Sequence, residues 1–244
     1  MSVRLDKFLS QSGERSRSEA VKAVRSGQVR VNGQPVRDPA LKINETDTVT
    51  LAGETVGDSA LQYYLFYKPA GVLTAARDKH AQTVMNLVPE AFRRRDVLPV
   101  GRLDKDTTGL LILTNDGALA HALLDPKRHV WKRYIATVEG RLDDEDIRAF
   151  AQGIDLGEFV AKPAELTILE AGDTESRAQV QVREGKFHQV KRMFGARGHE
   201  VTRLHRAAFG PLTIPEGMQE GEHQPLTDEQ VQLLRNAIQG IKKE

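Results

Sequence analysis

The most unusual segment of the chain is 101–109 (GRLDKDTTG), which places two acidic, two basic and two glycine residues between two apolar stretches. A carboxylate held in such a loop can act as a nucleophile or a general base. Asp104 and Asp106 also fit the first and third positions of a calcium loop, but the twelfth position would be Asn115 and the flanks resemble strands. A structural turn, in which the acids accept backbone N–H bonds, remains the favoured interpretation of Asp106 on composition alone.

A second concentration of charge lies at 183–193 (REGKFHQVKRM), where an expected strand meets an expected helix. Cations at a helix N-terminus oppose the helix dipole, so an acidic partner is expected, and a carboxylate of 101–109 would serve. His188, His199 and His205 raise the question of zinc, yet the chain has neither an HExxH motif nor a His pair four residues apart. We therefore interpret these histidines as solvated or hydrogen-bonded and expect no metal site.

A third candidate is Tyr134, which follows Lys132 and Arg133 in an expected strand at 131–138. A strand tyrosine most often packs in the core or against a neighbouring strand. The functional alternative is an aromatic ring beside a nucleobase flipped out of its stack.

Composition narrows the possible functions. The 244 residues include no cysteine, which excludes disulfides, thiolate catalysis and thiolate zinc sites. No apolar run approaches the roughly 20 residues of a membrane helix, and we expect a cytoplasmic protein. No GxGxxG motif or P-loop is present, so we expect neither a nucleotide cofactor nor any other cofactor.

Charge is unevenly distributed. The formal net charge is only +1, but residues 1–42 contain nine basic and four acidic residues. Such asymmetry favours a module that faces nucleic acid, although a solvated basic surface is the plain alternative. The basic residues expected to contact RNA phosphates are Arg4, Lys7, Arg15, Arg17, Lys22, Arg25 and Arg30.

The pattern around the basic residues predicts a small N-terminal domain. Leu5, Phe8 and Leu9 have helical spacing, and residues 16–19 (SRSE) form a capping box for a second helix that ends at Gly27. Asn32-Gly33 predicts a type I′ hairpin turn, and 48–51 another strand. We place this domain at 1–56, followed by a linker at 57–61 and a larger domain at 62–244.

The larger domain is expected to be α+β, with a mixed, mainly antiparallel sheet flanked by helices, because many connections are too short for crossover helices. Helices are expected at 118–124, 143–151 and 188–196 and from 227 onward. Strands are expected at 63–67, 72–74, 97–100, 110–113, 131–138, 177–182 and 201–206.

These residues together resemble a known family. Residues 101–110 (GRLDKDTTGL) resemble the catalytic motif of the Rsu-type pseudouridine synthases, and Tyr134 after Lys132-Arg133 is similar to the family's second motif. Residues 185–193 (GKFHQVKRM) look like its third motif, and 68–71 (KPAG) resemble an early strand and turn. The N-terminal segment resembles the S4-like RNA-binding domain that many of these enzymes carry. The resemblance extends from about Arg4 to Ile238.

The resemblance implies roles for individual residues. Asp104 would be the catalytic aspartate, as nucleophile or as base, and Tyr134 would pack against the target base and assist proton transfer. Lys191, in preference to Arg192, would pair with Asp104. Arg102 would fill the gap left by the flipped base. Substrate contacts would come from Arg102, Leu103, Val190 and Arg192.

The implied function is isomerisation of one uridine in 16S small-subunit rRNA, at uridine 516. The segment 187–191 (FHQVK) and a short C-terminus without a basic tail favour the small-subunit branch. The alternatives are a large-subunit 23S rRNA enzyme of the same family and a non-catalytic RNA-binding ribosome-assembly protein. The expected partner is rRNA or a small-subunit assembly intermediate, and the expected state is a monomer.

Overall fold

The computed structural model describes every residue except 1, 12–15, 45, 57–60 and 240–244. The chain forms two compact units, one comprising Met1–Gln62 and Val88–Leu98 and the other Tyr63–Leu87 and Pro99–Glu244. Of the expected linker at 57–61, residues 57–60 lie outside the described residues. Each unit is α+β and has its own apolar core.

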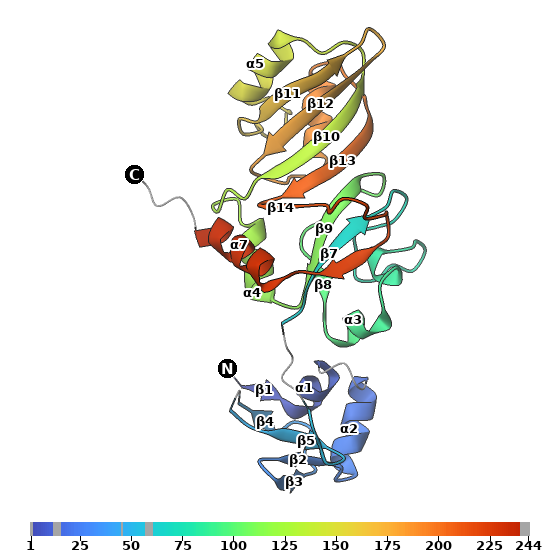
Figure 1. Ribbon diagram of the computed structural model, residues 1–244, viewed down its shortest axis with the longest axis vertical. Helices are drawn as coiled ribbons and strands as arrows, with labels where there is room; N and C mark the ends of the chain where they lie inside the picture. The colour runs from blue at the N-terminus through green and yellow to red at the C-terminus, as the bar shows by residue number, and fades with distance from the viewer. Residues whose placement is uncertain (1, 12–15, 45, 57–60, 240–244) are drawn as a thin grey trace. The chain divides into compact units, whose positions relative to one another are not determined.

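The N-terminal unit builds its core from two short helices and small sheets (Figure 1). The Ser16 side chain accepts from the Glu19 N–H and the Glu19 carboxylate from the Ser16 N–H, so the predicted capping box is confirmed. Asn32 and Gly33 have φ of 51° and 78°, as a type I′ turn requires. The elements are β1 (Val3–Arg4), α1 (Leu5–Gln11), α2 (Arg17–Arg25), β2 (Val29–Val31), β3 (Gln34–Val36), β4 (Lys42–Ile43), β5 (Val49–Leu51), β6 (Glu54–Thr55) and α3 (Glu90–Arg94).

The second unit is organised around one large sheet in the order β11-β12-β10-β13-β9-β7-β15, with β14 pairing to β13 and β8 to β9. The only parallel pairing along this order is between β13 and β9; the others are antiparallel. The strands are β7 (Tyr63–Lys68), β8 (Leu98–Pro99), β9 (Thr108–Thr114), β10 (Lys132–Glu139), β11 (Glu165–Ala171), β12 (Glu175–Val182), β13 (Val201–Phe209), β14 (Leu212–Thr213) and β15 (His223–Pro225). The helices are η1 (Val84–Asn86), α4 (Gly117–Leu124), α5 (Asp144–Gln152), α6 (Gln189–Ala196) and α7 (Asp228–Gln239).

Helices cover the two halves of this sheet separately (Figure 1). On the half formed by β10 to β13, α5 and α6 bury a core in which the Phe150 and Phe194 rings lie 4.9 Å apart. On the half formed by β7 and β9, α4 and α7 contribute Leu119, Leu123 and Leu234 to a second core. The expectation of a mixed, mainly antiparallel sheet flanked by helices is therefore confirmed.

The structure differs locally from the sequence predictions. Residues 72–74 do not form a strand, and only Leu73 makes an isolated bridge, to Thr83. Among the elements that were not predicted are β11, which is exposed along most of its length, and β15, which has only three residues. Among the helices of the described residues, none is long and apolar enough to cross a bilayer.

Candidate active site

The loop that carries Asp104 enters the sheet where its two halves meet. Gly109 at the start of β9 lies directly against the backbone of Arg206 on β13, and a Cβ atom at position 109 would collide with that backbone. Gly109 also has a φ of +116°, which favours glycine strongly. This close approach fixes the end of the loop at the parallel junction between β9 and β13.

A buried lysine holds the rest of the loop. Lys68, at the end of β7, has no exposed surface, and its Nζ donates to the carbonyls of Lys105 at 3.2 Å and Thr107 at 2.9 Å. A third bond joins Nζ to the carbonyl of Pro69 at 2.8 Å, in the predicted turn 68–71. Burial lowers the pKa of Lys68 to about 8, an effect that the nearby carboxylates of Asp106 and Asp104 oppose.

The segment after Lys68 contacts the same loop. The Gly71 N–H donates to the Lys105 carbonyl at 2.8 Å. The Thr74 hydroxyl donates to the Leu103 carbonyl at 2.8 Å and accepts from the Leu103 N–H at 3.1 Å. Residues 68–74 therefore fix the loop backbone on both sides of Asp104.

Asp104 lies at the edge of a small cavity of about 60 Å³. Its side chain is 27% exposed, so the carboxylate is partly accessible, while Tyr134 on β10 is almost fully buried in the same cavity wall. Leu103 and Val190, both nearly buried, also line the cavity, and Arg102 lines it with its side chain exposed. The structure thus brings together five residues that the sequence assigned to one site.

The partner predicted for Asp104 is wrong in this structure. Lys191 Nζ bonds both carboxylate oxygens of Asp106, at 2.6 and 2.7 Å, and this hydrogen bond lowers the pKa of Asp106 against the effect of burial. The side chain placed against Asp104 is His188, whose Nε2 lies 3.4 Å from Oδ1. His188 and Lys191 are three residues apart at the start of α6 and lie on one side of it. His188 faces Asp104, and Lys191 faces Asp106.

Arg192, predicted to contact substrate, points elsewhere. Its guanidinium donates to Glu158 at 3.1 Å and to the Leu156 carbonyl at 3.0 Å, and it does not line the cavity. The other two histidines are held by hydrogen bonds: His199 by the Glu139 carbonyl and His205 by the Thr108 hydroxyl. Their interpretation as hydrogen-bonded is confirmed, and no group of three potential metal ligands occurs among the described residues.

Two residues of the site were missed by sequence reasoning. Lys68 was noted only as part of a turn, because nothing in a sequence marks a lysine as buried. His188 was not predicted to lie against Asp104. The signal that could have found it is its position in the basic segment 183–193, for which an acidic partner was expected. His188 adopts a left-handed backbone conformation with φ of 50°.

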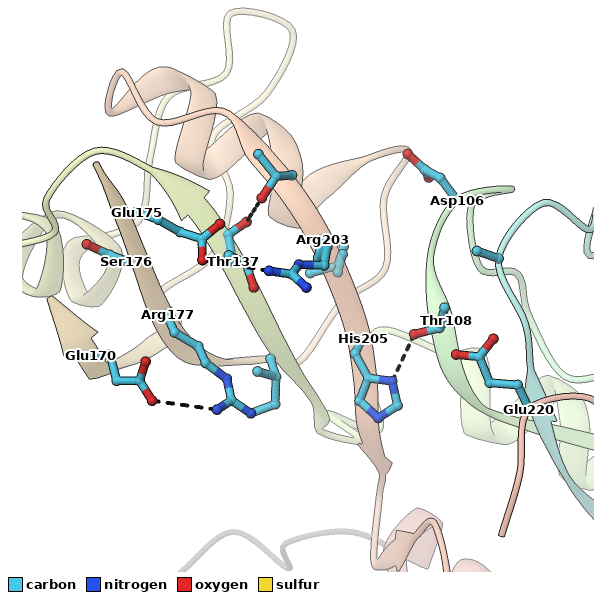
Figure 2. Close-up of a pocket in the computed structure, with 14 residues that line it drawn as sticks. Asp106, Thr108, Thr137, Glu170, Glu175, Ser176, Arg177, Arg203, His205 and Glu220 are labelled. Atoms are coloured by element: carbon cyan, nitrogen blue, oxygen red, sulfur yellow. Dashed lines mark hydrogen bonds and ion pairs between the residues drawn. The ribbon is translucent and has the colours of Figure 1, made fainter. Parts of the chain in front are cut away.

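A larger cavity of about 720 Å³ lies on the opposite face of β10, where Ile135 and Thr137 point away from the Tyr134 side. Figure 2 shows its charged side chains, with Arg177 against Glu170 and Arg203 against Glu175, both at 3.7 Å. These arginines are already compensated by acids. The cavity therefore has no excess of positive charge with which to bind a phosphate.

In the N-terminal unit, the predicted RNA-binding residues within the described part of the chain are all exposed, while Arg15 lies outside it. Arg4 and Arg17 bond the buried carboxylate of Asp6, at 2.9 and 3.4 Å. Arg30 donates to the Gly33 carbonyl. Exposed basic groups are thus found on α1, α2 and β2, on Lys7, Lys22, Arg25 and Arg30.

Comparisons with known proteins agree with this interpretation of the chain. Residues 62–196 match the model of the RNA pseudouridylate synthase family, and residues 3–49 match the S4 domain. A crystal structure titled as a pseudouridylate synthase superimposes with a TM-score of 0.67 at 34% identity, covering 95% of this chain and 99% of that chain.

Three of the curated relatives illustrate the names that similar proteins carry. An uncharacterized RNA pseudouridine synthase of Bacillus subtilis is 39% identical, covering 95% of this chain and 98% of its own. A ribosomal large subunit pseudouridine synthase B of the same organism is 36% identical, covering 95% of each chain. A ribosomal small subunit pseudouridine synthase A of Yersinia pestis is 34% identical, covering 94% of this chain and 97% of its own. With the family model, the S4 domain and relatives along nearly the full length, the chain belongs to the RNA pseudouridylate synthase family and is an RNA pseudouridine synthase.

Proposed function

We propose that the chain isomerises one uridine of small-subunit rRNA, with Asp104 as the reacting carboxylate. The observation that carries this proposal is the position of Asp104, partly exposed in a loop fixed by Lys68 and Thr74, beside a cavity whose wall includes Tyr134. A fixed carboxylate with partial solvent access is suited to attack or deprotonation without a costly rearrangement.

The reaction is balanced without an oxidant or reductant. The bond between the ribose C1′ and the base N1 breaks, the base turns, and a bond forms between C1′ and C5. The C5 hydrogen leaves as a proton while N1 gains one. Asp104 acts either as the nucleophile or as the base in this sequence, at the sugar or at the base ring. The His188 imidazole lies beside this carboxylate, with Nε2 3.4 Å from Oδ1.

The target base must leave its stack to reach Asp104. Tyr134 and Val190 then pack against the flipped base, and the exposed Arg102 occupies the gap that the base leaves. Lys191 acts through Asp106, which it holds at the loop, rather than through Asp104. Arg192 keeps a role in binding only if the RNA draws it away from Glu158.

The small-subunit target rests on the segment Phe187 to Lys191, which resembles the small-subunit branch. Identity does not decide the matter, because the large-subunit relative at 36% and the small-subunit relative at 34% differ by only two percentage points. We assign the target to 16S rRNA, with uridine 516 as the specific site. The exposed basic residues of the S4 domain bind RNA phosphates, and the enzyme works as a monomer in the cytoplasm on rRNA or an assembling subunit.

The test is to offer purified small- and large-subunit rRNA, and assembly particles of each, in competition and to map pseudouridine in the products. We expect one modified uridine, confined to small-subunit RNA. Modification confined to large-subunit RNA would overturn the target and leave the chemistry standing. Failure to modify any of these substrates would overturn the proposed rRNA function.

A further inference from the structure

Phe187 is an aromatic side chain in solvent beside the candidate active site. It is 73% exposed, more than any other large hydrophobic residue in the part of the chain that the structure describes. Burial of an aromatic ring would stabilise the fold. A ring that is exposed beside a site for nucleobases therefore indicates a role in binding the substrate.

The ring has a defined position rather than a free one. It stacks on the His188 imidazole with centroids 3.8 Å apart and planes 16° apart, and the other edge of that imidazole faces Asp104. The turn that carries Phe187 is held in place by Gln189. The Gln189 side chain accepts from the Lys186 N–H at 3.1 Å and donates to the buried Glu184 at 2.8 Å. Phe187, His188 and Asp104 therefore form a continuous row.

The surroundings suit a polyanion. Lys186 and Arg102 are exposed near the same mouth, and the Lys186 ammonium lies over the Phe159 ring at 3.6 Å. RNA that places a uridine at Asp104 must carry its neighbouring nucleotides past this mouth. A nucleobase is flat, like the exposed surface of Phe187, and base–aromatic stacking is tolerant of sequence.

We propose that Phe187 is a stacking platform for the nucleobase adjacent to the target uridine, with His188 seated between that platform and Asp104. The proposal rests on the proposed function and adds a substrate-positioning residue to it. One side of the Phe187 ring is supported by the imidazole, so an incoming base completes a three-ring stack. That stack would hold the strand next to the emptied position while the uridine lies in the cavity.

The test compares Phe187→Ala, Phe187→Leu and Phe187→Trp with the wild-type protein. The probe is a small-subunit rRNA transcript, and the readouts are its dissociation constant by filter binding and the single-turnover rate over a range of enzyme concentrations. Leu169→Ala on β11 is the matched control, because Leu169 is also an exposed hydrophobic residue but lies outside the segment that joins β12 to α6 and carries Phe187 and His188. Thermal midpoints of all variants establish that each is folded.

We expect the Ala and Leu variants to bind at least about fivefold more weakly and to need correspondingly more enzyme for half-maximal rate. The Trp variant and the Leu169 control should resemble the wild type. Retention of wild-type affinity by the Leu variant would mean that Phe187 only packs against His188 and would overturn the proposal, as would unchanged affinity of the Ala variant. If the wild-type protein binds the transcript but converts no uridine, the proposed function fails while the affinities still decide the platform.

Discussion

Replacing Lys68 with methionine tests whether the position of the catalytic loop depends on the hydrogen bonds from this buried lysine. The substitution keeps most of the side-chain volume and removes the three hydrogen bonds from Nζ to the carbonyls of Pro69, Lys105 and Thr107. Hydrogen bonds to charged groups contribute about 1.5–3 kcal/mol each in favourable cases, so their loss is substantial. The substitution also removes a buried charge.

The two effects oppose each other in global stability. Burial that lowers the pKa of Lys68 from 10.5 to about 8 corresponds to a penalty on the charged form of roughly 3 kcal/mol. Because the folded-state pKa lies below the unfolded value, this penalty is fully present below pH 8 and is relieved as pH rises toward 10.5. The loss of three hydrogen bonds exceeds the relief of this penalty, so we expect Lys68→Met to lower the free energy of unfolding at pH 7 by about 1.5–6 kcal/mol.

The rate of the folded variant should fall as well. A loop that shifts by about an ångström misplaces the Asp104 carboxylate, and such errors cost about 100-fold in rate. In the wild type the single-turnover rate should also fall as pH rises through about 8, because a neutral amine has two hydrogens for three carbonyls. The methionine variant should lack that alkaline decline.

The matched control is Lys132→Met. Lys132 is also buried, with a pKa that burial lowers to about 8, but its Nζ bonds only the Val130 carbonyl, outside the loop. The assay is single-turnover release of tritium from RNA labelled at uridine C5, beside urea denaturation. Two results would refute the claim that Lys68 positions the loop. One is a Lys68→Met variant that reacts at the wild-type rate, and the other is a Lys132→Met variant whose rate falls as much as that of Lys68→Met.

Two further predictions concern the sheet junction and the S4 domain. Gly109→Ala should lower the free energy of unfolding, measured by urea denaturation, by at least about 3 kcal/mol. The control Gly157→Ala, also at positive φ but in open space, should lower it by about 1 kcal/mol. Equal effects of the two substitutions would contradict the collision with Arg206. Replacing Lys7, Lys22 and Arg25 with alanine should weaken RNA binding and shallow its salt dependence by about one unit for each phosphate that is no longer bound, with the rate at saturating RNA intact; an unchanged salt slope would show that these residues form only a solvated surface.

Local signals in the sequence were enough to predict the elements that they directly specify. The Ser16 capping box, the Asn32-Gly33 turn and the strand pattern of 177–182 in β12 all depend on neighbouring residues, and all three are confirmed. The helix caps at Asp143 and Thr227 belong to the same class and are also confirmed.

Features that depend on distant parts of the chain were not predictable. The strand β15 forms because it pairs with β7, more than 150 positions earlier, and its own three residues carry little pattern. Lys68 is buried because the loop at 101–109 folds over it. Lys191 pairs with Asp106 and His188 lies against Asp104 because the fold brings the start of α6 to that loop, about 85 positions earlier in the chain. The residue types were enough to identify the site, but which loop acid lies against which side chain of α6 could be assigned only from the fold.

The central claim is that the carboxylate of Asp104 performs the isomerisation, and the most direct test compares Asp104→Asn with Asp106→Asn. Both substitutions are nearly isosteric and lie in the same loop, but only the first removes the partly exposed carboxylate at the cavity. Single-turnover tritium release should be abolished by Asp104→Asn with RNA affinity nearly unchanged, because an amide is neither a comparable nucleophile nor a base. Asp106→Asn should retain measurable turnover. A rate near the wild type in the Asp104→Asn variant would contradict the claim.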